Sequence, residues 1–135
     1  MIAKLRGKKF PQFVDYVLRD AASKCGKGHN CGGVDAHWRP QYSRCLYCDI
    51  PYDVIGKMET FADDVRYIVT KQNLTHLIPE RITGLKSHAS SGQESKTLKY
   101  FRQLSRQQIK GLYRLYSPDF ELFDYDASEY LSLDI

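Results

Sequence analysis

The sequence predicts a predominantly helical protein with a cysteine-rich loop and few strands. Three observations support this prediction. Apolar residues recur at helical spacing in several stretches, all four cysteines fall within one glycine-containing segment, and only one short run alternates as a strand does. The chain has 135 residues, 42% hydrophobic and 27% charged, which is the composition of one globular domain or of part of one.

The first predicted helix covers residues 10–23. Pro11 suits its first turn, because proline has no amide hydrogen to donate and the first turn needs none. The residues that recur at helical spacing, and that we expect to face a core, are Phe10, Phe13, Val14, Val17 and Leu18.

Residues 24–51 contain all the cysteines and read as an ordered loop that needs cross-links. The spacing is C-x5-C-x13-C-x2-C, formed by Cys25, Cys31, Cys45 and Cys48. An even number of clustered cysteines indicates either two disulfides or one zinc site, for which His29 and His37 lie near enough to be alternative ligands. The spacing alone leaves both possibilities open.

A short strand is predicted at Tyr52–Ile55, where it would join a sheet whose other strands are missing from this sequence. A second helix follows Thr60 and ends near Gln72-Asn73, with two carboxylates in its first turn. Asn73-Leu74-Thr75 is an N-glycosylation sequon at the exit of this helix.

The C-terminal part begins with a predicted loop at residues 83–96, which is rich in serine and glycine. A short helix is then expected at Leu98–Leu104. Ser105-x-x-Gln108 has the pattern of a capping box and opens a further helix. We expect Ser117-Pro118 to stop that helix and Asp119–Phe123 to form a last turn.

The formal net charge of +4 suits a partner rich in carboxylates or sulfates, but it is equally ordinary for a solvated surface. Aromatic and basic residues also interleave near the C-terminus, as they do in some nucleic-acid-binding surfaces. Their helical spacing is better explained by core packing, so no nucleic-acid partner is expected. No signal peptide or membrane span is visible in the sequence.

Residues 35–64 contain the only tryptophan, a Cys-x-x-Cys pair and the start of the second helix. Their motifs are His37-Trp38-x-Pro40, Cys45-x-x-Cys48, Tyr52-Asp53-x-Ile55-Gly56-Lys57 and Glu59-Thr60 followed by Asp64. The flanking motifs are Phe13-Val14-x-Tyr16 and Leu112-Tyr113-x-x-Tyr116-x-x-Asp119-Phe120-x-Leu122-Phe123-x-Tyr125. In this order they resemble the C-terminal half of the Golgi carbohydrate sulfotransferases, the family of the chondroitin, dermatan and HNK-1 enzymes.

This resemblance implies a carbohydrate O-sulfotransferase with an α/β, P-loop-like fold, of which residues 1–135 are the C-terminal part, a predominantly helical fragment of that fold. Such an enzyme transfers a sulfuryl group from 3′-phosphoadenosine 5′-phosphosulfate to a glycan hydroxyl, for example on a glycosaminoglycan. The family's basic phosphosulfate-binding loop and its Arg/Ser motif for the donor 3′-phosphate are absent from this sequence, so we expect the donor site to lie outside it.

The resemblance also implies a location at the Golgi membrane, on the lumenal side, through an N-terminal anchor that this chain does not contain. It therefore favours disulfides over zinc for Cys25, Cys31, Cys45 and Cys48, because that compartment is oxidising. No metal is expected, and Asn73 becomes a candidate for glycosylation.

Five residues are candidates for the chemistry. His37 is the candidate base for the acceptor hydroxyl, and Glu59 is a candidate that either binds this hydroxyl or caps the second helix. Trp38 could stack on a sugar, Arg39 could pair with a uronate or sulfate, and Asp35 completes the acceptor-side set. In a purely structural alternative, His37 and Trp38 pack the cysteine loop onto the core. A non-catalytic glycan-binding module and a small zinc-stabilised domain remain the alternative functions.

Overall fold

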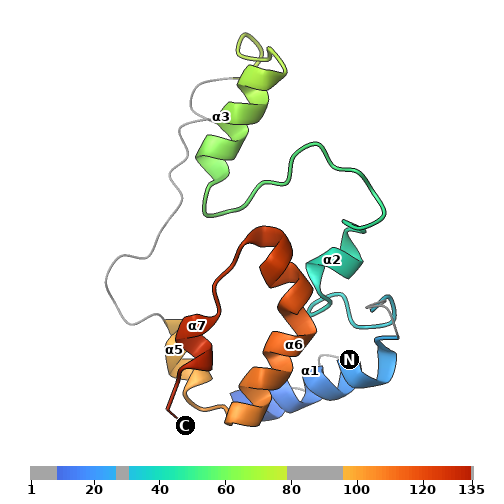
Figure 1. The fold of residues 1–135 in the computed structure, drawn as a ribbon, viewed down its shortest axis with the longest axis vertical. Coiled ribbons are helices and arrows are strands. Elements are labelled where there is room, and N and C mark those ends of the chain that lie inside the picture. Colours follow the sequence, from blue (N-terminus) through green and yellow to red (C-terminus); the bar gives the residue numbers. More distant parts are fainter. Residues whose placement is uncertain (1–8, 27–30, 79–95, 135) are drawn as a thin grey trace. The chain divides into compact units, whose positions relative to one another are not determined.

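A computed structural model describes residues 9–26, 31–78 and 96–134 (Figure 1). The chain divides into two units, one formed by residues 1–50 with 94–135 and the other by residues 51–93. Unit 1 contains α1 (Phe10–Lys24), α2 (Gln41–Arg44), α5 (Lys96–Phe101), α6 (Arg106–Phe123) and α7 (Ser128–Leu131). Unit 2 contains α3 (Phe61–Lys71).

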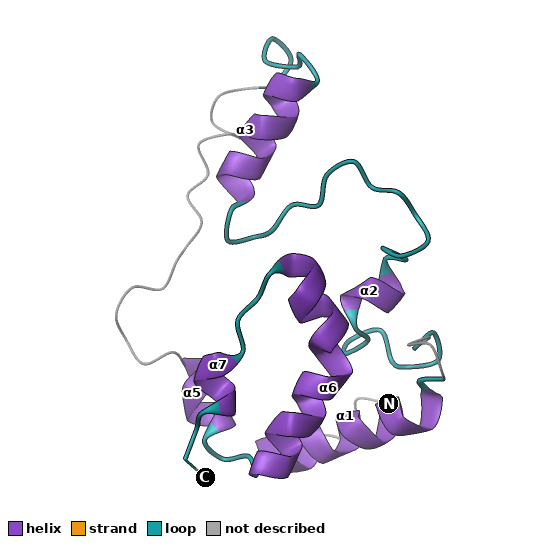
Figure 2. Cartoon of the chain, in the orientation of Figure 1, coloured by secondary structure: helices purple, strands orange, loops and turns teal. Residues whose placement is uncertain are grey.

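All regular secondary structure in the described residues is helical (Figure 2). The strand predicted at Tyr52–Ile55 is therefore wrong, and these four residues have no regular structure. A strand needs a neighbouring strand to pair its backbone N–H and C=O groups, and the described residues contain none. The loop predicted at 83–96 lies outside the described residues except for Lys96, which begins α5.

The first predicted helix is confirmed as α1. Proline lies in its first turn, and the Gln12 side chain accepts a hydrogen bond from the Lys9 backbone N–H at 3.2 Å. The face of α1 that is buried carries three apolar residues and one carboxylate, namely Val14, Val17, Ala21 and Asp20.

Helix α6 packs against α1, and its first turn is fixed as the sequence predicts. The Gln108 backbone N–H donates to Ser105 Oγ at 3.3 Å, while the Ser105 N–H donates to Gln108 Oε1 at 2.9 Å. The Gln108 amide also donates to Asp15 Oδ1 at 2.7 Å and to the Pro11 carbonyl at 3.0 Å. One side chain therefore caps α6 and joins it to α1.

The prediction that Ser117-Pro118 stops this helix is wrong, because α6 continues through Pro118 to Phe123. A proline inside a helix leaves the carbonyl four residues earlier without its usual donor. Here the Ser117 hydroxyl donates to that carbonyl, on Arg114, at 3.2 Å. The helix ends instead at Asp124, which has the left-handed φ of 53° that commonly closes a helix.

Two small hydrophobic clusters form the core of unit 1. The first has Val14, Leu104 and Ile109 at its centre, and the second has Ala21, Cys31 and Val34. Between them α1 and α6 approach closely at Gly111, where a Cβ atom would lie 2.9 Å from Leu18 Cδ1. Glycine permits this approach because it has no side chain.

Helix α2 is held by a carboxylate from α6, more than seventy residues away in the sequence. Asp119 Oδ2 accepts from the Gln41 N–H and Asp119 Oδ1 from the Tyr42 N–H, both at 2.8 Å. The first N–H groups of a helix have no partner within it, so the carboxylate satisfies two of them. Asp119 is only 8% exposed, and this contact fixes where the segment before α2 ends.

In unit 2, a carboxylate in the first turn organises the start of α3. Asp64 Oδ2 accepts from Thr60 Oγ1 at 2.6 Å and from the Lys57 N–H at 2.8 Å, and these two bonds hold the pKa of Asp64 below its ordinary value. The helix ends at Lys71 with Gln72 as its C-cap, and Asn73, the next residue, has a left-handed φ of 55°. The predicted end near Gln72-Asn73 is confirmed.

We predict that Asp119→Ala lowers the free energy of unfolding by about 2–4 kcal/mol, because each buried N–H left without an acceptor costs about 1–3 kcal/mol. Urea denaturation measures this change. The exposed Glu121 on the same helix is the control, and Glu121→Ala should change stability by no more than about 0.5 kcal/mol. Equal effects of the two substitutions would show that Asp119 does not hold α2.

Candidate functional site

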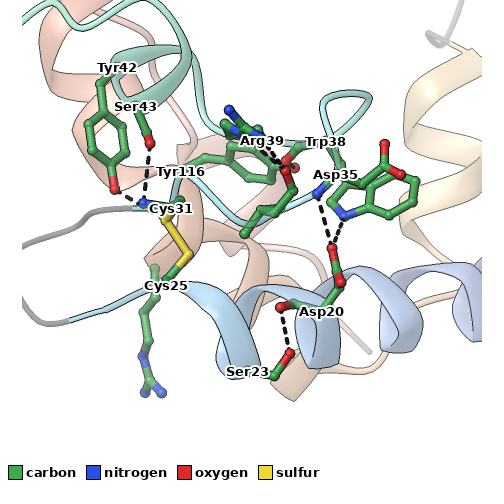
Figure 3. The surroundings of a disulfide bond; sticks show 12 residues. Asp20, Ser23, Cys25, Cys31, Asp35, Trp38, Arg39, Tyr42, Ser43 and Tyr116 are labelled. Atoms are coloured by element: carbon green, nitrogen blue, oxygen red, sulfur yellow. Dashed lines mark hydrogen bonds between the residues drawn. A yellow bond between two sulfur atoms is a disulfide. The ribbon is translucent and has the colours of Figure 1, made fainter.

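The segment between α1 and α2 carries most of the predicted site residues, and a disulfide closes its N-terminal end. Cys25, which follows α1, is bonded to Cys31 (Figure 3). Cys31 is buried, its N–H donates to Ser43 Oγ at 3.2 Å, and its sulfur lies 3.5 Å from the Tyr42 hydroxyl. The disulfide therefore also packs against α2. It is one of the two bridges that the sequence analysis expects.

The other two cysteines, Cys45 and Cys48, carry thiols in this structure. Cys45 Sγ donates to Gln41 Oε1 at 3.5 Å, and Cys48 is exposed. A second disulfide through these residues stays a prediction. Within residues 9–26, 31–78 and 96–134, no three His, Cys, Asp or Glu side chains are grouped so that they could hold a metal ion.

A buried carboxylate of α1 anchors the middle of this segment. Asp20 Oδ2 accepts from the Trp38 indole Nε1–H at 2.9 Å and from the Asp35 backbone N–H at 3.2 Å (Figure 3). Its other oxygen pairs with Lys24 one turn later on α1. Burial disfavours the charged form, but the hydrogen bonds from Lys24, Trp38 and Asp35 outweigh burial and hold the pKa of Asp20 below its ordinary value.

Trp38 is partly buried, and its position is fixed on several sides. The rings of Phe13 and Tyr16 on α1 meet it edge-to-face, with centroids 6.0 and 5.7 Å away. The Tyr116 hydroxyl of α6 donates to the Trp38 carbonyl at 2.7 Å. Burial, with a smaller contribution from the charge of Asp119, raises the pKa of Tyr116 to about 12. Trp38 thus packs the cysteine segment onto the helices, as the structural alternative in the sequence analysis expects.

Arg39 is used, at least in part, to shape the same segment. Its Nε and Nη2 groups donate to the Val34 carbonyl at 3.0 and 2.7 Å. These two bonds from one guanidinium fold the chain back on itself over five residues, and Val34 is buried beneath it. A role for Arg39 in acceptor binding stays a prediction.

His37 differs from its neighbours because its side chain is open to solvent, with 72% of it exposed. Its Nδ1 lies 2.6 Å from Asp35 Oδ1, and its backbone N–H donates to the same oxygen at 3.0 Å. These two hydrogen bonds hold the pKa of Asp35 below its ordinary value. Within the described residues His37 Nε2 makes no hydrogen bond or ion pair, so this nitrogen is available to a ligand.

The structure brings Asp35, His37, Trp38 and Arg39 together, but it does not test Glu59. Glu59 is exposed and lies in unit 2, whose position relative to unit 1 is not defined. Asn73 is also in unit 2 and is exposed, as a glycosylation site must be.

Unit 1 also contains an apolar cavity of about 360 Å³ beside Trp38, lined by core side chains of α1, α5, α6 and α7. No charged residue of the described chain lines it. A polar sugar or sulfate needs several hydrogen-bonding partners, and this mostly apolar lining offers only the hydroxyls of one threonine and three tyrosines. The open segment that carries His37 is therefore the better candidate site.

Sequence reasoning missed Asp20, and it missed the roles of Tyr116 and Asp119 in holding this site, although both stand in the downstream motif. A usable signal existed for the two carboxylates. Asp20 follows Val14 and Val17 at helical spacing, and Asp119 follows Leu112 and Tyr116 in the same way. A carboxylate within an apolar stripe is unusual and indicates a buried group with fixed donors.

The pattern that defines the sulfotransferase family matches residues 3–126. The chain belongs to the sulfotransferase family.

Among its relatives are carbohydrate sulfotransferases of vertebrates. The chain is 31% identical over 126 residues to carbohydrate sulfotransferase 11 of Rattus norvegicus. The aligned region covers 93% of this chain and 33% of the relative. It is 32% identical over 130 residues to carbohydrate sulfotransferase 10 of Danio rerio, with the same coverage. It is 34% identical over 116 residues to carbohydrate sulfotransferase 12 of Xenopus laevis, covering 86% of this chain and 25% of the relative.

The chain thus spans about a third of the length of the curated relatives it matches. No solved structure matches it significantly.

We predict that Asp20→Asn lowers stability at pH 7 and that the difference from wild type narrows below about pH 4. The pKa of Asp20 is lowered in the folded state, so its contribution is present above the ordinary carboxyl pKa of about 3.9 and is lost as the pH falls through the folded value. Urea denaturation at pH 7 and pH 3 measures both differences.

The control for this experiment is Asp49→Asn, at an exposed carboxylate outside the Asp20 network. Its effect on stability should be small at both pH values. A difference between Asp20→Asn and wild type that is the same at pH 7 and pH 3 would contradict the assigned direction of the Asp20 shift.

Proposed function

We propose that the protein transfers a sulfuryl group from 3′-phosphoadenosine 5′-phosphosulfate to a hydroxyl of a glycan, and that this chain supplies the acceptor side. Membership of the sulfotransferase family supports the reaction class. The names of the relatives, which are carbohydrate sulfotransferases, support a glycan as the acceptor.

The observation that carries this proposal is the exposed imidazole of His37. Sulfuryl transfer to an alcohol needs a base that takes the hydroxyl proton, and histidine is the side chain that most often does this near neutral pH. His37 has one ring nitrogen bonded to Asp35 and the other available. Because the ring projects from an anchored segment, an acceptor can reach it without rearrangement of the core.

The residues on either side of His37 suit a carbohydrate. The Trp38 ring lies with its centroid 6.3 Å from that of His37, and its partly exposed surface would contact a sugar bound at His37. Arg39 keeps N–H groups beyond the two that bond to Val34, because a guanidinium has five donors in all. These groups would pair with a uronate or sulfate. With the net charge of +4, they favour an anionic acceptor such as a glycosaminoglycan.

We further propose that residues 1–135 are the C-terminal part of a P-loop-like sulfotransferase domain and that the donor is bound outside them. The donor-binding motifs of the family are absent from this sequence, which supports this division of roles. Glu59 remains a second candidate base, since it belongs to the Glu59-Thr60 motif.

A lumenal Golgi location fits two features of the chain. The Cys25–Cys31 disulfide is typical of the oxidising secretory pathway, and the Asn73 sequon is exposed. No helix within the described ranges is long and apolar enough to cross a membrane.

We predict that His37→Ala lowers the turnover of the whole protein by about 10²–10⁴-fold, because a positioned base contributes a factor of this size. Donor affinity and melting temperature should stay near the wild-type values, since the side chain is exposed and packs into neither cluster. Turnover is measured with labelled donor and a chondroitin acceptor, and stability on the same preparation.

His76→Ala, at an exposed histidine of unit 2, is the matched control and should remain active. A stable His37→Ala protein with full activity would exclude His37 as the base. If the wild-type protein binds the glycan but transfers no sulfuryl group, the alternative of a non-catalytic glycan-binding module holds instead.

We predict that Asn73→Gln removes one N-glycan when the protein is made in the secretory pathway. The Asn73 side chain is exposed at the end of α3, where a transferase can reach it. The check is the mass shift after glycosidase treatment, compared with Gln72→Ala, which leaves the sequon intact. If Asn73→Gln and wild type differ in mass before treatment only by the substitution itself, Asn73 is not used.

A further inference from the structure

We infer that Asp35 is a positioning residue for His37, and not a ligand of the acceptor. This inference rests on the proposed function, because it assigns the group that prepares the proposed base. It starts from the 2.6 Å contact between Asp35 Oδ1 and His37 Nδ1. The same oxygen accepts the His37 backbone N–H at 3.0 Å, so a single atom fixes both the turn and the ring.

The contact decides which ring nitrogen carries the proton. A carboxylate can only accept hydrogen bonds, so Nδ1 must be the donor. The neutral ring is then the Nδ1–H tautomer, with its lone pair on Nε2. That nitrogen has no partner within the described residues, so the lone pair is directed where an acceptor hydroxyl could approach.

The exposure of the two side chains agrees with this division of roles. Only 14% of the Asp35 side chain is exposed, against 72% of the His37 side chain. An acceptor ligand would be expected to present its carboxylate to solvent. Here the shielded carboxylate faces the histidine, and the histidine faces outward.

Asp35 is itself held by the buried network on α1. Its backbone N–H donates to Asp20 Oδ2 at 3.2 Å, and the Trp38 indole N–H donates to the same oxygen at 2.9 Å (Figure 3). The other oxygen of Asp20 pairs with Lys24. The position of the imidazole is therefore set through Asp35 by a rigid helix. A base must keep a defined geometry to act in the transition state, and this chain of contacts supplies it.

The reaction moves one proton and one sulfuryl group. As the acceptor oxygen forms its bond to sulfur, its proton passes to His37 Nε2. The bond between sulfur and the bridging oxygen of the donor breaks, and its electron pair leaves with adenosine 3′,5′-bisphosphate. The resulting imidazolium is stabilised by the negative charge of Asp35 until it returns its proton to solvent.

Asp35→Asn separates this role from a purely structural one. The asparagine carbonyl can still accept the His37 backbone N–H, so the turn is kept. The charge is lost, however, and the amide N–H₂ can donate to Nδ1, which favours the Nε2–H tautomer. In NMR spectra of the isotope-labelled 135-residue chain, recorded on the neutral ring, wild type should show the Nδ1–H form and Asp35→Asn a shift toward Nε2–H.

In the whole protein, Asp35→Asn should lower kcat by about 10²-fold or more while KM for the glycan changes little, because only the transition state is affected. Asp49→Asn is the control and should leave both constants unchanged. An increase in KM at constant kcat would make Asp35 an acceptor ligand and overturn the inference.

The spectra keep the inference testable even if a variant does not fold. A wild-type ring in the Nε2–H form would overturn it without any substitution. A failure of the proposed function can be distinguished from a failure of the inference on Asp35. If His37→Ala is fully active, His37 is not the base, and the NMR result then reports only whether Asp35 orients the ring.

Discussion

The site depends on one buried carboxylate. Asp20 lies on the face of α1 that packs into the core, and desolvation there is unfavourable unless every lone pair has a donor. The donors come from the segment after the disulfide, from the Trp38 indole and the Asp35 backbone, and from Lys24 on the same helix. Burial of the charge therefore requires the segment to adopt one conformation. Because Asp20 holds Asp35 and Asp35 contacts His37, this conformation also fixes the position of the exposed His37.

Asp119 is a second buried carboxylate that holds this segment, from α6 instead of α1. Its carboxylate on α6 accepts the first N–H groups of α2, so the segment is held where it ends as well as in its middle. Between the two carboxylates, Arg39 folds the chain back onto the Val34 carbonyl, and Tyr116 donates to the Trp38 carbonyl. An irregular stretch thus becomes rigid through hydrogen bonds to its backbone, which satisfy the groups of it that are buried.

The sequence predicts best where the cause of the structure is local. The periodicity of residues 10–23, the capping box at Ser105 and the end of α3 near Asn73 are all confirmed, because each depends on neighbouring residues. The strand at 52–55 fails for lack of a pairing strand in the described residues. The stop at Pro118 fails because the Ser117 hydroxyl replaces the missing donor.

At the site, too, the sequence predicts local features better than distant contacts. His37, Trp38 and Arg39 can be selected from their motif, but their partners come from α1, α6 and the turn itself. Asp20 is eighteen residues from Trp38, and Tyr116 is seventy-eight. No local pattern contains such contacts. Only the placement of a carboxylate within an apolar stripe indicates that one of them exists.

The continuity of α6 through Pro118 has a consequence for how the chain tolerates changes in length. Tyr116 and Asp119 are three residues apart on one helix, so their side chains share a face and reach neighbouring parts of the 38–42 segment. Each inserted or deleted residue turns a helix by about 100°. Insertion of one residue between them would point one of the two side chains away from its partner while leaving the composition almost unchanged. At this point the spacing of the two residues along the helix constrains the protein as well as their identity.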